Sequence, residues 1–149
     1  MIDIAPSLVI AILTQVACQV YKVVYHSIRE RELQLSYFVS AGGAPSAHSA
    51  FVTALAVSIG LRSGFGSDVF AVAGVLASIV VYDAYRLRGQ VESHARAIND
   101  INHRLGDRFG VRLGGTGLES ELVGHTIPEI LMGITIGVIS AVVFSLFYG

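Results

Sequence analysis

Long apolar runs are the feature that most restricts how this chain can fold. They cover residues 4–25, 45–61, 68–86 and 124–147, and a helix crosses a bilayer core with about 20 apolar residues. Only 14% of the chain is charged, against roughly 25% in soluble domains. Because backbone groups inside lipid must be satisfied within the protein, such runs form helices. We therefore expect an all-α integral membrane bundle of about four transmembrane helices, built as one domain over residues 1–149.

The second apolar run is short for a span, so we expect its helix to be tilted or shielded by its neighbours. It is rich in small residues such as Ala50, Ala54 and Gly60, which let helices approach closely in lipid. Small-residue helix faces of this kind also offer a contact for a homodimer.

Charge and cysteine usage exclude some classes of partner. The formal net charge of −1 provides no basic field for nucleic acid, so the bilayer is the expected macroscopic partner. The N-terminus begins Met-Ile-Asp and lacks the basic region of a secretory signal. The single cysteine, Cys18, lies in an apolar run, where we expect a small core residue.

The segments between the runs differ in character. Residues 26–41 are predicted to form a short amphipathic connector in the membrane interface. Residues 62–68 are predicted to form a tight Gly/Ser turn, and residues 89–112, with apolar side chains at helical spacing, a surface helix on the membrane face. Five glycines within 106–117 indicate a turning loop.

Basic residues orient the bundle. With four spans, both charged connectors lie on one side, together with nine of the ten lysines and arginines; Arg62 alone lies on the other. Positive charge gathers on the cytoplasmic side of membrane proteins. We therefore expect that side to be cytoplasmic, with both termini on the opposite side.

The segment Gly42–Ala50 interrupts the backbone before the second run. Two glycines and Pro45 precede Ser46 and His48, at a point where a helix would begin. Free N–H groups and the helix dipole attract phosphate there, and His48 is placed to exchange a proton with a bound ligand. The alternative interpretation is an ordinary helix cap, with Ser46 as the capping residue and His48 incidental.

A second segment, starting at His125, opens the last run. Glu129 lies four residues on, so one helical turn brings its carboxylate to an imidazole nitrogen. A carboxylate in that position fixes the tautomer that a histidine nucleophile or base requires. Gly133 and Gly137 follow at the spacing of a helix-packing groove.

The topology gathers ionisable residues at one membrane face, and such residues mark functional sites in membrane proteins. The alternative is a set of interfacial anchors and ion pairs, such as Asp83 with Arg86 or Arg88. A metal site built from the histidines and carboxylates is a third possibility, although no local spacing motif supports it. The residues gathered are Lys22, His48, Asp83, Arg88, His125 and Glu129.

These motifs resemble a known family. Pro45-Ser46-Ala47-His48 is similar to the PSGH motif of type 2 phosphatidic acid phosphatases and vanadium-dependent haloperoxidases, and His125-x-x-x-Glu129 is similar to their H-x-x-x-D motif. Gln19 with Lys22, Tyr82-Asp83-Ala84 with Arg88, and Gly124-His125-Thr126 resemble more closely the divergent type 2 phosphatases, a family of small membrane proteins related to acid phosphatases and haloperoxidases. This likeness extends over nearly the whole chain.

The resemblance implies a lipid-phosphate phosphohydrolase that needs no metal or other cofactor. It implies His125 as the nucleophile, Glu129 as its orienting partner and His48 as the acid for the leaving oxygen. The residues it implies for phosphate binding are Lys22, Arg88, Ser46, Gly43 and Ala47, with Asp83 and Gln19 in support.

A non-enzymatic lipid-phosphate binder or small transporter remains the alternative function. The superfamily places an arginine six residues before the nucleophilic histidine, where this chain has Glu119. Arg88 would then have to supply a guanidinium from another helix.

Overall fold

The computed structural model describes all residues except 1–3, 34, 39–42, 110–124 and 149, and leaves out some side chains within the helices. The described part contains helices and turns and no strand, which confirms the all-α prediction. The helices are α1 (Pro6–Glu30), the short 3-10 helix η1 (Leu35–Phe38), α2 (Ala47–Ser63), α3 (Asp68–Phe109) and α5 (Ile127–Tyr148).

Three of these helices are long and apolar enough to cross a membrane within the described part of the chain. They are α1 over its whole length, α3 from Asp68 to Arg86, and α5 from Ile127 to Phe147. The fourth expected span corresponds to α2, which has only 17 residues. The prediction of about four membrane helices therefore holds as an approximate count.

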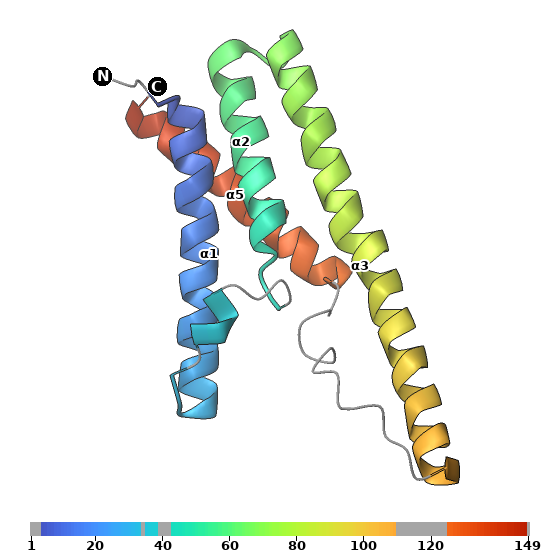
Figure 1. The fold of residues 1–149 in the computed structure, drawn as a ribbon. Helices are drawn as coiled ribbons and strands as arrows, with labels where there is room; N and C mark the ends of the chain where they lie inside the picture. The colour runs from blue at the N-terminus through green and yellow to red at the C-terminus, as the bar shows by residue number, and fades with distance from the viewer. Residues whose placement is uncertain (1–3, 34, 39–42, 110–124, 149) are drawn as a thin grey trace.

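Helix α2 lies at the centre of the bundle, in contact with α1, α3 and α5 (Figure 1). Its buried positions carry mostly alanine, serine and glycine, which lets the neighbouring backbones approach. Near one end of the bundle, the buried Ser58 donates a hydrogen bond of 3.1 Å to Ser7 of α1. Shielding of this short run by its neighbours was predicted, and it is confirmed.

Two glycines set the close crossing of α5 over α2. A Cβ added at Gly133 would overlap the carbonyl oxygen of Ser46, and one added at Gly137 would lie 2.6 Å from that of Ala50. Any larger residue would separate the two backbones. The packing groove predicted from the Gly133–Gly137 spacing is therefore present, and it faces α2.

The predicted turn between the second and third spans connects α2 to α3. Gly64 has a φ of 87°, a conformation that L side chains rarely adopt, and it ends α2. Ser67 then starts α3, because its Oγ accepts a 3.2 Å hydrogen bond from the N–H of Phe70. The start of α1 and the end of α5 lie near this turn, at the same end of the bundle (Figure 1).

Helix α3 differs from the prediction of a separate surface helix over 89–112. Residues 89–109 are helical, but they continue the third span as one helix of 42 residues that projects beyond the bundle (Figure 1). No proline interrupts the segment, and its two glycines, Gly89 and Gly106, cost a helix only about 1 kcal/mol each. An exposed ion pair of 2.9 Å between Asp100 and Arg104, four residues apart, is typical of a solvated helix.

The connector predicted over 26–41 is also shorter than expected. Helix α1 continues to Glu30 and ends at Arg31, which has a φ of 55° in the left-handed region. Helix η1 then packs back against α1. The glycine-rich loop predicted over 106–117 begins inside α3, and its remainder lies outside the described residues.

Candidate phosphate site at one end of the bundle

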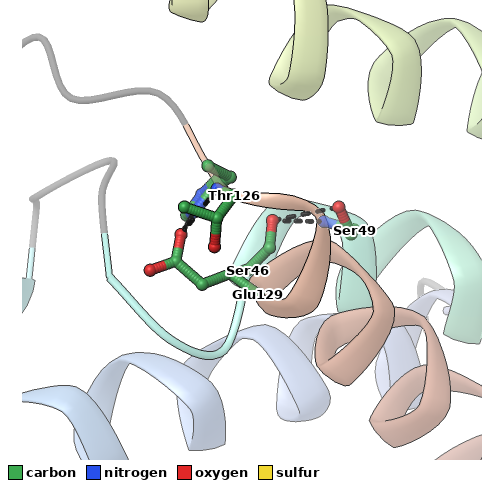
Figure 2. A network of polar contacts seen from close by, with 5 residues as sticks. Ser46, Ser49, Thr126 and Glu129 are labelled. Carbon is green, nitrogen blue, oxygen red and sulfur yellow. Dashed lines mark hydrogen bonds and ion pairs between the residues drawn. The ribbon is translucent and has the colours of Figure 1, made fainter.

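The turn before α2 interrupts the helical backbone where its glycines and proline predict. Gly43 has a φ of 83°, and the Ala44–Pro45 peptide bond is cis. Ser46 is the N-cap residue of α2: its Oγ accepts a hydrogen bond of 3.4 Å from the N–H of Ser49 and lies 2.9 Å from the Ser49 Oγ (Figure 2). The capping interpretation therefore describes Ser46 correctly. His48 is half-buried in the first turn that follows.

The second segment forms the contact that its spacing predicts. Nδ1 of His125 lies 3.2 Å from Oε2 of Glu129, and the His125 side chain is fully buried. The same Oε2 accepts a 3.0 Å hydrogen bond from the backbone N–H of Thr126 (Figure 2). The Thr126 N–H and the His125 imidazole thus hold the carboxylate in place at the start of α5, where the helix dipole also favours negative charge.

The two segments, about eighty positions apart in sequence, are joined directly. The backbone N–H of Ser46 donates a hydrogen bond of 3.0 Å to the carbonyl oxygen of Glu129. One turn further along α5, Gly133 lies against the Ser46 carbonyl. The start of α2 and the start of α5 are therefore held side by side (Figure 2).

Helix α1 turns its polar face toward the start of α2. Cys18 packs against Ala47 and Ala50, which places the next turn of α1 near the capped end of α2. Lys22 is only 1% exposed and Gln19 is 8% exposed. An amine is costly to bury at membrane depth, so a lysine there is a functional candidate.

One histidine of this end was missed as a candidate from the sequence. Nε2 of His26 lies 3.9 Å from the position that a Cβ on Gly43 would occupy. Its Nδ1 lies 3.5 Å from Oε1 of Glu30, which repeats the His-x-x-x-Glu spacing of His125 and Glu129. The signal was available, because residues 15, 19, 22 and 26 continue one helical face of α1.

Residues within 78–85 of α3 and within 127–134 of α5 line a common groove, which shows that α3 approaches the start of α5. Asp83 is half-buried on this part of α3 and forms no ion pair with Arg86 or any other described side chain. The side chain of Arg88, predicted to bind phosphate, lies outside the described residues. The proposed site therefore draws on four helices, and the structure describes most of its side chains.

A metal site built from the histidines and carboxylates was the third possibility that the sequence left open. Within the part of the chain that the structure describes, no three His, Cys, Asp or Glu side chains gather closely enough to hold a metal ion.

Comparison with known proteins gives two matches of different kinds. The sequence matches a family described as "Divergent PAP2 family" over residues 5–140. It is also 33% identical over 138 residues to the uncharacterized membrane protein YuiD of Bacillus subtilis (strain 168), covering 87% of each chain. No solved structure matches.

Proposed function

The chain belongs to the divergent PAP2 family, and on that premise we propose that it is a phosphohydrolase acting on a lipid phosphate at the membrane surface. The observation that carries the proposal is the pairing of His125 with Glu129, directly beside the capped start of α2. A carboxylate on Nδ1 keeps the proton on that nitrogen and leaves the lone pair of Nε2 available for attack.

The first proposed step forms a bond between Nε2 of His125 and phosphorus while the bond from phosphorus to the lipid oxygen breaks. His48 gives its proton to the departing oxygen, so the lipid leaves as an alcohol. Glu129 stabilises the imidazolium character that develops on His125.

The second proposed step returns the enzyme to its starting state. His48, now neutral, takes a proton from a water molecule, whose oxygen attacks phosphorus and breaks the bond to Nε2. Inorganic phosphate leaves, and both histidines regain their original protonation states.

The negative charge on the phosphoryl oxygens has to be stabilised throughout both steps. Preorganised N–H and cationic donors do this best where water is excluded. Lys22 is the best-supported donor, because it is buried next to the turn of α1 that packs on α2. The other proposed donors are Arg88, the Ser46 hydroxyl and the backbone N–H groups of Gly43 and Ala47, with Asp83 and Gln19 as supporting residues. The charge asymmetry of the loops supports a cytoplasmic location for this face.

A non-enzymatic lipid-phosphate binder or small transporter is the second candidate. Two observations favour it: the His125 side chain is fully buried, and Glu119 occupies the position of a phosphate-binding arginine in the superfamily. In this alternative His125 and Glu129 cap α5, and the phosphate is bound without being cleaved.

The test is phosphate release by purified protein from a panel of lipid phosphates, with a chelator present. His125→Ala should lower the rate by about 10³-fold or more, as removal of a nucleophile does. Binding of the lipid phosphate should survive, because the donors remain. His103→Ala, an exposed histidine on the projecting part of α3, is the matched control and should change nothing.

Trapping with radiolabelled substrate adds a second measurement. The parent should carry a protein-bound phosphate that is lost in acid and kept in alkali, and His125→Ala should carry none. An adduct that persists in His125→Ala contradicts the mechanism. Binding without release from any lipid phosphate establishes the second candidate instead.

A further inference from the structure

One buried amide side chain on α1 lacks a hydrogen bond. Gln19 is only 8% exposed, and its Oε1 is buried without a hydrogen-bond partner among the described residues. Buried polar groups in folded proteins are nearly always hydrogen-bonded, and one left unsatisfied lowers stability. On the same helix, the buried Thr14 is satisfied locally, because its hydroxyl donates a 2.8 Å hydrogen bond to the carbonyl oxygen of Ile10. The amide of Gln19 therefore indicates a position where a bound molecule supplies the missing hydrogen bond.

Two contacts of α1 show which way this amide faces. One position before it, Cys18 packs against Ala47, the first residue of α2. Seven positions after it, Nε2 of His26 lies 3.9 Å from the place that a Cβ on Gly43 would occupy, in the turn before α2. Residues seven apart point within about 20° of each other around a helix, so Gln19 shares the face of His26. The side of α1 that carries Gln19 therefore faces the turn leading into α2.

A neighbouring lysine restricts the kind of ligand. Lys22 lies three positions after Gln19, a spacing at which side chains of a helix are neighbours, and it is only 1% exposed. A buried ammonium favours an anionic ligand, because removing its charge from water is costly unless an opposite charge lies close by. An amide has N–H donors and a carbonyl acceptor, so it can bond a phosphoryl oxygen in either protonation state. The two groups together suit a phosphate monoester.

We propose that Gln19 binds the phosphoryl group of the ligand directly, so that its amide is satisfied only when the site is occupied. This inference rests on the proposed function and replaces the supporting role given there to Gln19. A lipid headgroup and free phosphate share the required chemistry. Because the amide weakens the empty protein and strengthens the complex, stability and affinity should change in opposite directions when it is removed.

The first measurement is the apparent Tm of the ligand-free protein in detergent. Gln19→Met keeps the length of the side chain and removes the amide, so it should raise the Tm by about 2–4 °C or more. Thr14→Val is the matched control, because it removes a buried polar group of α1 that already has its hydrogen bond, and it should give no such rise. A lower Tm for Gln19→Met would show that the amide stabilises the empty protein, and would overturn the inference.

The second measurement is the affinity for two probes that the protein cannot cleave. One is a phosphonate analogue of phosphatidic acid in phosphatidylcholine vesicles, and the other is inorganic phosphate. Gln19→Met should weaken binding by about 10- to 100-fold, the usual effect of losing a hydrogen bond to a charged group, and Thr14→Val should leave it unchanged. Gln19→Glu keeps the shape of the side chain and can pair with Lys22, so it is the second variant. It should weaken binding further, because its charge repels the phosphoryl oxygens.

The two probes distinguish the source of the phosphoryl group. Binding of both by the parent, each weakened in Gln19→Met, supports the contact and shows that free phosphate is sufficient. Binding of the phosphonate lipid alone, weakened in the same variant, supports the contact and assigns it to a lipid headgroup. A loss for the phosphonate lipid beside unchanged binding of inorganic phosphate overturns the inference, because Gln19 then contacts another part of the lipid.

The remaining outcomes separate this inference from the proposed function. Unchanged affinity of Gln19→Met for both probes, with phosphate release by the parent intact, overturns the contact and leaves the phosphohydrolase standing. Affinity that depends on Gln19, with no phosphate release from any lipid phosphate, supports the contact and removes the phosphohydrolase.

Discussion

The close contact between α5 and α2 gives the sharpest quantitative prediction. In Gly133→Ala, the added methyl group overlaps the carbonyl oxygen of Ser46, which is backbone and cannot rotate away. Ser46 also donates its backbone N–H to the carbonyl oxygen of Glu129. Separating the two helices would therefore strain the hydrogen bond that joins the two segments of the site. Gly74→Ala is the matched control, because a methyl group there meets nothing within 4 Å.

The expected magnitude follows from comparing the two variants. Each replaces glycine by alanine inside a helix, and each gains about 0.5–1 kcal/mol in free energy of unfolding from that change alone. Since this gain is common to both, their difference isolates the cost of the overlap. Overpacking of a well-packed contact costs about 1–3 kcal/mol. We therefore expect Gly133→Ala to be less stable than Gly74→Ala by about 1–3 kcal/mol, and to be destabilised or unchanged relative to the parent.

The assay is the free energy of unfolding of detergent-solubilised protein, titrated with a denaturing surfactant and followed by helical circular dichroism. Lipid-phosphate binding measured on the same samples should fall for Gly133→Ala and stay unchanged for Gly74→Ala. If both variants gain stability by the same amount, α5 does not lie against Ser46, and the link between the two segments of the site is wrong.

Two further predictions concern proton transfer and topology. His48→Ala should slow cleavage of a lipid phosphate by about 10²–10⁴-fold, the usual contribution of a general acid, but should affect an aryl phosphate with an activated leaving group much less. Comparing the two substrates for parent and variant tests this, and equal losses would contradict the assignment of His48 as the acid. Single cysteines placed at residues 3 and 100 of a cysteine-free chain should react with impermeant reagents from opposite sides of the membrane. Reaction of both from one side would contradict the predicted orientation.

The membrane fold could be predicted because hydropathy and charge are properties of each segment by itself, whichever other segments it packs against. The apolar runs became helices, and the small residues around Ala50 and Ala54 correctly indicated a shielded second helix. Helix α3 could not be delimited in this way. The charge pattern marks where the apolar part of the helix ends, near Arg86, but a change from apolar to polar residues does not by itself end a helix.

The candidate site could likewise be predicted only where it depends on local sequence. The contact between His125 and Glu129 follows from helical spacing alone, and it is present. The hydrogen bond from Ser46 to Glu129 depends on how α5 crosses α2, so local pattern could not predict it. His26 was overlooked because it lies one turn beyond the polar residues of the first span, where a histidine resembles an ordinary interfacial residue. Its proximity to Gly43 depends on how the connector folds back.

The length of α2 has a consequence for the lipid around the protein. Its 17 residues extend roughly 26 Å, short of the hydrocarbon thickness of about 30 Å. If α2 crosses the bilayer, at least one of its ends lies below the level at which headgroups normally rest, unless the surrounding leaflet thins. Under the proposed function, with the capped end of α2 as the short end, a lipid phosphate would reach Ser46 by sinking a few ångströms or by meeting a locally thinned membrane. Bilayer thickness would then be a variable of the proposed reaction, and thinner membranes should bring phosphate and protein together with less elastic work.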